Sequence, residues 1–391
     1  MANNIGYTIP WHPPAASLAV TNELRPRSFC KIVTVFMTDV APGFDSILLV
    51  SFGGPEGMDD VMPFLENVLR GKNVPPQRML EVAEHYRQFD GVSPINEQNR
   101  ALIAALRAEL DSRGIELPIY WGNRNWQPLL PDALRQMRDA GCQRAIAFFT
   151  SMFSCYSGCR QYREDILRAQ QEVGEGAPQV EKVRKGFNHP KFIAAQADCV
   201  QAGLESLSAD RRPVAKLLFS AHSIPMSMAD HSNYALQLNE ACRLVAETVG
   251  HEDWELVYQS RSGPPQQPWL EPDICERIEK LSSHGIGDVV VVPLGFISDH
   301  IEVLFDLDTE AKQLCERLGM GFVRAASVGV HPQFVSMIAD LLQERIHSLQ
   351  TRASVGQLGA SHDACPVDCC LYPREAGGVR PAVNDPAQSR R

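Results

Sequence analysis

Strand-length apolar runs and helical stretches alternate along this chain in two successive sets, and this alternation constrains the fold most. The first run, SILLVSF at residues 46–52, is continuously apolar, which is typical of a strand that helices cover on both faces. The other expected strands lie at 118–122, 144–150, 214–220, 255–259, 288–293 and 321–324. The pattern predicts an α/β fold of two doubly wound halves with parallel sheets.

The length of the chain sets its predicted division. Its 391 residues exceed the ~100–200 residues of a usual domain, and its apolar fraction of 44% can fill two cores. We predict a poorly ordered extension over 1–44, with Met37 as an alternative start. An N-terminal half over 45–186, a C-terminal half over 187–349 and a tail over 350–391 complete the division.

Charge and hydropathy exclude two classes of partner. The 47 acidic residues exceed the 37 basic ones, for a net charge of −10, and no basic block stands out. Because nucleic-acid binding needs clustered Lys and Arg, no nucleic-acid partner is expected. No stretch approaches the ~20 apolar residues of a membrane-spanning helix, so we expect a soluble chain without a transmembrane segment.

Ligands of open parallel sheets bind at the carboxyl ends of the strands, so residues that follow strands are candidate site residues. His222, in AHSIP, follows the strand at 214–220 and is predicted to project into a cleft between the halves. A lone histidine more often has a structural role than a functional one. Because this histidine follows a strand, a functional role and a structural role are equally expected. After the strand at 288–293, Glu302, Asp306 and Glu310 recur every four residues and line one face of a helix expected at 300–318.

The chemistry of this set suits a metal ion. An acidic helix face is usually only solvated, but here like charges repel at a spacing of four, and the face starts at a strand-end cleft. Such a line can attract and pass on a cation. An imidazole opposite a carboxylate, His222 and Glu302, suits Fe²⁺ binding or proton transfer and does not resemble a closed zinc site. Aromatic and arginine residues at 120–126 and 259–265 either pack the core or bind a flat anionic ligand.

The cysteines form two patterns. Six of the eleven are scattered singly, as buried thiols of a reduced protein are. The other five fall in two groups, Cys155 with Cys159, and Cys365 with Cys369 and Cys370. A chain of this length needs no disulfide staples, so the groups are either a metal site or five incidental thiols.

Several long motifs of the sequence resemble the ferrochelatase family. The resemblance extends over about residues 46–349. Its motifs occur in the order of the family and read LLVSFGGPE, EHYRQFDGVSPIN, YWGNRNWQP, SAHSIP, QSRSGPP and GFISDHIEVLFDLDTE. The resemblance implies two flavodoxin-like, chelatase-type halves around a central porphyrin cleft. It also implies a lyase that inserts Fe²⁺ into a porphyrin in haem biosynthesis, with Fe²⁺ and the porphyrin as substrates, in the cytoplasm.

The resemblance assigns roles to individual residues. By motif match, His222 and Glu302 hold Fe²⁺ or take the pyrrole protons, and the metal site belongs to the C-terminal half. Ser93, in GVSPI, and Tyr162, in CRQYRED, are implied to contact the porphyrin. Asp306 and Glu310 continue from Glu302 as the acidic line of the family, a route for metal or protons.

Some ferrochelatases carry a [2Fe–2S] cluster, and the tail of this chain resembles theirs. The segment CPVDCC resembles the actinobacterial type and implies that Cys365, Cys369 and Cys370 are three of the four ligands. The context YSGC implies Cys159 as the ligand from the body, and Cys155 is the alternative because it stands where animal enzymes place theirs. Four thiolates close such a site.

The resemblance to the family also bears on which porphyrin is the substrate. Protoporphyrin enzymes of animals have an apolar, membrane-contacting lip at the position of residues 61–77. The stretch over 61–77 is short and only half apolar, and with the tail it favours a monomeric coproporphyrin III enzyme over a protoporphyrin IX enzyme. Candidate partners for the carboxylates of coproporphyrin are Arg70, Lys72, Arg78 and Arg124. The alternatives from other classes are a non-catalytic haem or metal carrier and a cobalt chelatase.

Overall fold

The structure is a computed structural model that describes residues 43–71, 74–264, 266–372 and 382–383. The predicted extension over 1–44, with its alternative start at Met37, lies outside the described residues except for Gly43 and Phe44. Lys72 and most of the chain after 372 also lie outside them.

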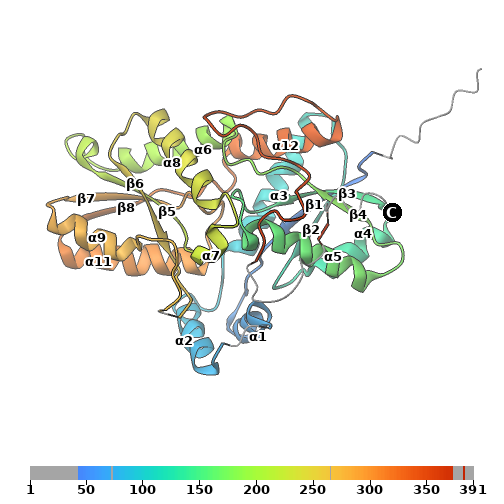
Figure 1. The fold of residues 1–391 in the computed structure, drawn as a ribbon, viewed down its shortest axis with the longest axis horizontal. Helices are drawn as coiled ribbons and strands as arrows, with labels where there is room; N and C mark the ends of the chain where they lie inside the picture. Colours follow the sequence, from blue (N-terminus) through green and yellow to red (C-terminus); the bar gives the residue numbers. More distant parts are fainter. Residues whose placement is uncertain (1–42, 72–73, 265, 373–381, 384–391) are drawn as a thin grey trace, which may run out of the picture. The chain divides into compact units, whose positions relative to one another are not determined.

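Two four-stranded parallel sheets carry the described part of the chain (Figure 1). The first sheet has the order β2-β1-β3-β4 and consists of β1 (Ser46–Ser51), β2 (Ile119–Asn123), β3 (Arg144–Phe149) and β4 (Gln179–Lys182). The second has the order β6-β5-β7-β8 and consists of β5 (Lys216–His222), β6 (Trp254–Gln259), β7 (Asp288–Val292) and β8 (Gly321–Arg324). Both sheets share one strand order, which confirms the predicted α/β class with doubly wound parallel sheets.

The strands alternate between two apolar layers, as buried parallel strands do. In β1, Ile47 and Leu49 face one core cluster, whereas Leu48 and Val50 face another. Strand β4 was not expected from the sequence, because QVEK has a single strongly apolar residue. It is held by parallel pairing with β3, in which Val180 lies opposite Ala145.

Helices pack on both faces of the sheets. One core cluster is continuous across both sheets and includes residues of α3 (Ile95–Ser112), α6 (Pro190–Glu205), α8 (Tyr234–Val249) and α12 (Pro332–Ile346). The opposite face of the first sheet carries α4 (Leu130–Asp139) and α5 (Gln161–Val173). The opposite face of the second carries α9 (Ile274–Ser283), the π-helix η3 (Leu304–Ala311) and α11 (Lys312–Leu318). The division into halves at 45–186 and 187–349 stays a prediction.

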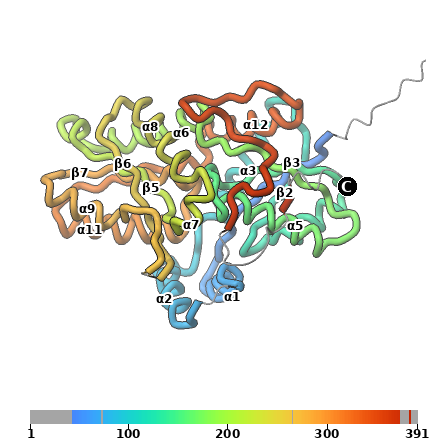
Figure 2. Tube along the Cα trace, viewed as in Figure 1, coloured from blue at the N-terminus to red at the C-terminus, as the bar shows by residue number. Residues whose placement is uncertain are grey.

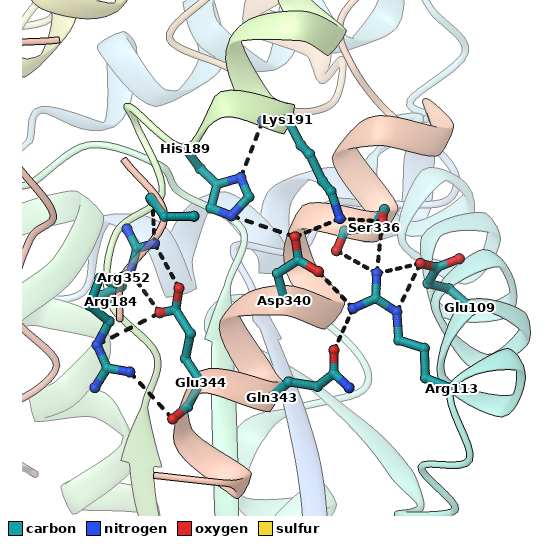
Figure 3. Close-up of polar contacts among 11 residues, drawn as sticks. Glu109, Arg113, Arg184, His189, Lys191, Ser336, Asp340, Gln343, Glu344 and Arg352 are labelled. Atoms are coloured by element: carbon teal, nitrogen blue, oxygen red, sulfur yellow. Dashed lines mark hydrogen bonds and ion pairs between the residues drawn. The ribbon is translucent and has the colours of Figure 1, made fainter. Parts of the chain in front are cut away.

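A polar network joins α12 to the first half (Figure 3). Arg113, the residue after α3, donates to Asp340 of α12 at 2.7 Å. Arg184, which follows β4 and is fully buried, donates to both carboxylate oxygens of Glu344 at 2.7 and 2.9 Å. Arg352, at the start of the tail, approaches the same carboxylate at 3.9 Å. The last helix is therefore tied to elements from the other end of the chain.

Two short helices, α1 (Met58–Leu69) and α2 (Pro76–Arg87), form a pair that projects from the sheets (Figure 1). They pack through a cluster that includes Phe64, Tyr86 and Ile301. His85 of α2 also stacks on Phe305 of η3, with ring centroids 3.8 Å apart. Within the described residues, no helix has the length and apolar character needed to cross a membrane.

The tail runs from α12 past α8, where the amide of Gln357 donates to Glu240, and then toward η1 (red in Figure 2). Asn188 donates to the carbonyls of Val355 and Gly359 at 3.1 and 2.7 Å. Ser361 donates to the carbonyl of Lys185 at 2.9 Å. The tail then reaches the π-helical turn η1 (Tyr156–Arg160), where Arg160 donates to the carbonyl of Val367 at 2.7 Å.

Candidate active site

A cavity of about 780 Å³ opens where the central strands of both sheets end. Its walls include Phe52 after β1, Thr150 after β3, His222 at the end of β5 and Phe296 after β7. Residues of α1 and α2 complete the lining. The site thus lies at the carboxyl ends of the strands, as ligand sites of open parallel sheets do.

His222 is the last residue of β5 and points its free nitrogen toward a carboxylate. Its Nδ1 bonds to the carbonyl oxygen of Ser223, and because a carbonyl only accepts, Nδ1 carries the hydrogen. In the neutral ring the lone pair is therefore on Nε2, which lies 3.6 Å from Oε2 of Glu302. The hydroxyl of Tyr234 donates to the carbonyl of His222 at 3.1 Å and helps to fix the end of the strand.

Glu302 lies on the short helix α10 (Ile301–Val303) between two imidazoles. Nδ1 of His300 is 4.0 Å from the same carboxylate oxygen that faces His222. Burial, only partly opposed by the charge of Glu302, lowers the pKa of His300, so this ring is neutral near pH 7. Sequence reasoning missed His300, although it stands two residues before Glu302 in the same motif. One carboxylate and two imidazoles are suitable ligands for Fe²⁺.

The acidic line continues from Glu302 through the half-buried Asp306 to the exposed Glu310. Ser260 and Gln259 donate to Asp306, with Gln259 at 3.3 Å. Burial is the largest of the effects that raise the pKa of Asp306 to about 7. The negative charges of Glu302 and Glu310 also raise this pKa, whereas the hydrogen bond from Ser260 lowers it. These interactions show that the three carboxylates lie near one another, as the four-residue spacing predicts. The expected single helix over 300–318 is wrong in detail, since a π-helix separates two α-helical segments.

The raised pKa of Asp306 predicts a pH-dependent stability. Because the folded pKa of about 7 exceeds the ordinary value of 3.8, the folded protein binds more protons between these values than the unfolded chain. The free energy of unfolding should therefore fall as pH rises from about 4 to 7. Asp306→Asn should reduce this pH-dependent change in the free energy of unfolding by a few kcal/mol, because each unit of difference between folded and unfolded pKa corresponds to about 1.4 kcal/mol. Denaturant titrations of both proteins at pH 5 and 8, without added metal, measure this, and parallel pH slopes would contradict it.

Ser93 and Tyr162, expected to contact the porphyrin, both line the cavity. Ser93 is 4% exposed and packs so closely on Gly54 that a Cβ there would lie 2.7 Å from it. Tyr162 is equally buried, and burial raises the pKa of its hydroxyl. The guanidinium of Arg124 lies 4.6 Å from the centroid of its ring.

The four basic residues proposed as carboxylate partners differ in their surroundings. Arg124 lines the cavity but is buried in an ion pair with Asp165, at 2.6 Å. Arg70 and Arg78 line the cavity with exposed side chains, on or beside the helix pair. Lys72 lies outside the described residues. Arg70 and Arg78 are thus the described residues of this set that can turn toward an anionic ligand.

Four cysteines from two distant segments gather at η1. Cys159 shares a hydrogen bond with Cys365. This hydrogen bond is the main cause that raises the pKa of the Cys159 thiol, and burial is the second cause. Sγ of Cys369 lies 3.6 Å from Sγ of Cys370 and 3.6 Å from Nε2 of His362. The ligand atoms of His362, Cys365 and Cys369 lie within 4.8 Å of one another.

The two cysteines of the body face different surroundings. Cys159 contacts the tail, whereas Sγ of Cys155 accepts from the amide of Gly158 at 3.2 Å and lies at the cavity wall. This geometry favours Cys159 as the ligand from the body. Sequence reasoning missed His362, although the spacing His-x-x-Cys at 362–365 is a signal that could have identified it.

Comparisons with known proteins find similar sequences and structures. A family model described as "Ferrochelatase" matches residues 45–346. A ferrochelatase of Rhodopirellula baltica is 62% identical over 342 residues, which are 86% of this chain and 97% of that protein. A coproporphyrin III ferrochelatase of Streptomyces griseus is 49% identical over 373 residues, 89% of this chain and 99% of that protein. A solved sirohydrochlorin chelatase of Bacillus subtilis is similar with a TM-score of 0.49 at 9% identity, over 79% of this chain and 98% of that one.

Proposed function

This chain belongs to the ferrochelatase family, and from this membership we propose that it inserts Fe²⁺ into coproporphyrin III. Family membership makes the chain a metal-chelating lyase of haem biosynthesis. The observation that carries the assignment to this cavity is the pair formed by His222 and Glu302, whose ligand atoms face each other at 3.6 Å.

The reaction removes two pyrrole protons as the metal enters the ring, so the site must hold a cation and accept protons. Nε2 of His222 has its lone pair directed at the cavity side, which makes it the proton acceptor. Glu302 attracts Fe²⁺ and balances the charge of a protonated His222. Asp306 and Glu310 continue the negative line away from the cavity, so they supply a path for the metal or for departing protons. The roles of all four residues are proposals.

The choice of coproporphyrin III is supported by the basic residues at the mouth of the cavity. Coproporphyrin III has four carboxylates, more than protoporphyrin IX, and Arg70 and Arg78 line the cavity with exposed guanidiniums. Relatives with 48–49% identity are named coproporphyrin III ferrochelatases. A protoporphyrin IX ferrochelatase is the second candidate.

We expect Arg78→Gln to weaken the preference for coproporphyrin III. A hydrogen bond to a charged group contributes about 1.5–3 kcal/mol, so kcat/KM for this porphyrin should fall about tenfold or more, mainly through KM. Initial rates with coproporphyrin III and protoporphyrin IX under matched conditions measure the preference. Arg87→Gln, on the same helix and outside the cavity lining, is the matched control. A higher kcat/KM of the unaltered protein for protoporphyrin IX would contradict the proposed substrate.

We propose that the cysteine site holds a [2Fe–2S] cluster, with Cys159, Cys365, Cys369 and Cys370 as ligands. The set fits the group, since four thiolates complete its coordination and these four cysteines converge. The hydrogen bond to Cys365 and burial raise the pKa of Cys159, and the buried ammonium groups of Lys182 and Lys185 oppose this rise only in part. The same two positive charges would balance the negative charge of such a cluster. When bound, the cluster supplies a cross-link between tail and body and a one-electron couple.

Replacement of single cysteines should separate ligands from neighbours. Cys159→Ser and Cys369→Ser should lose the visible absorbance and the acid-labile sulfide of the anaerobically purified protein. Cys155→Ser, four residues from Cys159, is the matched control and should retain both. If Cys155→Ser lost the absorbance and the sulfide while Cys159→Ser retained them, Cys155 would be the body ligand instead of Cys159. A colourless protein with one zinc ion would assign His362 and the cysteines to a mononuclear site instead.

The location and assembly of the protein are also proposals. We infer a cytoplasmic monomer, and the free thiols among the described residues support the reducing compartment. A non-catalytic haem or metal carrier is the alternative from a different class. Turnover with Fe²⁺ separates the two, because a carrier binds the porphyrin or metal without producing haem.

A further inference from the structure

The π-helical turn η1 contributes residues both to the cavity wall and to the cysteine site. Ser157 and Gly158 line the porphyrin cavity. Cys159 and Arg160, the next two residues, are buried, and both contact the tail. A single turn of five residues therefore forms part of the cavity wall and part of the cysteine site.

Contacts other than the cysteines attach this turn to the tail. The guanidinium of Arg160 is 1% exposed and donates to the carbonyls of Val367 and Cys369 at 2.7 and 3.4 Å. The rings of Tyr156 and Tyr372 lie 4.9 Å apart. The segment that carries Cys365, Cys369 and Cys370 is thus attached to η1 by contacts within it and just after it.

Lys185 joins the same turn to Ser151, in the neighbouring segment of the cavity wall. This residue is 5% exposed, and its Nζ donates to the carbonyls of Ser151 and Gly158 at 2.6 and 2.7 Å. Both of these residues line the cavity. The carbonyl of Lys185 in turn accepts from Ser361 of the tail.

The wall held by Lys185 has little room to adapt. A Cβ added to Gly158 would lie 2.6 Å from Oγ of Ser151 and 3.1 Å from the carbonyl of Phe153. Because the segment is packed this tightly, a shift of η1 toward or away from the tail moves the cavity wall with it. The cysteine site and the porphyrin site therefore share one rigid part.

We propose that η1 couples the cysteine site to the porphyrin cavity, with Lys185 as the positioning residue. Loading of the cysteine site fixes η1 against the tail, and Lys185 then holds the Ser151–Gly158 wall in the position that receives the porphyrin. By linkage, porphyrin binding must strengthen retention of the cluster by the same factor. This inference rests on the proposed porphyrin site and the proposed cluster.

The test measures binding without turnover. The intact protein is prepared with and without its cluster, and metal-free coproporphyrin III is titrated onto each form anaerobically, with fluorescence quenching as the readout. We expect the Kd to be about fivefold or more lower for the loaded form, within the usual range of coupling between sites. Chelator-driven loss of cluster absorbance should slow when the porphyrin is present.

Variants separate positioning from general structure. Lys185→Met should bring the ratio of the two Kd values toward one while the cluster absorbance stays, and Lys185→Arg should restore part of the ratio. Lys216→Met is the matched control, since this buried ammonium pairs with Asp253 and Glu255 outside the cavity lining, and it should keep the ratio. Ser361→Ala, on the tail, should lower the ratio even if Lys185→Met fails to fold.

The outcomes are distinguishable. Equal Kd values for the loaded and cluster-free forms overturn the coupling and leave the proposed function intact. No porphyrin binding in either form overturns the proposed function itself. A protein that takes up no iron and sulfide overturns the cluster and, with it, this inference.

Discussion

His222→Ala should lower the rate of Fe²⁺ insertion by about 10²–10⁴-fold, the usual contribution of a general base. The substitution removes the Nε2 lone pair that faces Glu302 at 3.6 Å. It should spare the fold, because the imidazole is one-third exposed to the cavity and its hydrogen bond to Ser223 is local. The measurement is the change in porphyrin absorbance on metal insertion, with thermal unfolding of both proteins in parallel.

A second histidine provides the matched control. His231 is exposed, its Nδ1 bonds to the carbonyl of Ser227 at 2.8 Å, and it is not part of the cavity lining. His231→Ala should therefore insert metal at the unaltered rate. Unaltered turnover of His222→Ala would remove this histidine from the mechanism. A large drop in thermal stability would point to a structural role instead.

Glu344→Gln should destabilise the protein by about 3–5 kcal/mol, the usual effect of breaking a buried ion pair. Arg184 is fully buried and donates to both oxygens of this carboxylate, so the variant leaves a buried guanidinium without its counter-charge. Arg352 of the tail loses a partner charge as well. Denaturant unfolding of the purified variant measures the loss.

An exposed ion pair provides the comparison. Glu84 and Arg87 on α2 form a contact of 2.9 Å with side chains that are 61% and 66% exposed. Exposed pairs contribute about 0–1 kcal/mol, so Glu84→Gln should change stability very little. Equal effects of the two variants would mean that the buried pair does not hold α12 to the first half.

The candidate site could be predicted at the ends of the strands. Continuous apolar runs such as 46–52 identify buried parallel strands, and parallel strands bring their carboxyl ends to one edge. For this reason the positions of His222 and Glu302 in the sequence, although far apart, were enough to place both residues at one cleft. Strand β4 escaped the same reasoning because its sequence, QVEK, lacks an apolar run, and its pairing with β3 and the packing of Val180 in the core hold it in place.

Other members of both sites depend on long-range packing. His300 is recognisable as a neighbour of Glu302 only once the turn into α10 brings its Nδ1 within 4.0 Å of that carboxylate. Similarly, Cys155 and Cys159 lie on one short segment, and only the path of the tail distinguishes them. It brings Cys365 to Cys159 and leaves Cys155 at the cavity wall.

The sequence by itself determined the α/β class, the strand-end position of His222 and Glu302, and the family. These follow from local patterns, because hydrophobic periodicity and motifs are properties of short segments. Only the tertiary structure decided the tautomer of His222, the burial of Asp306, the contact of His362 with Cys369 and the bridge made by Lys185. The tautomer depends on the backbone conformation that brings the carbonyl of Ser223 to Nδ1 of His222. The others depend on how segments pack once the chain has folded, and no local sequence pattern records this packing.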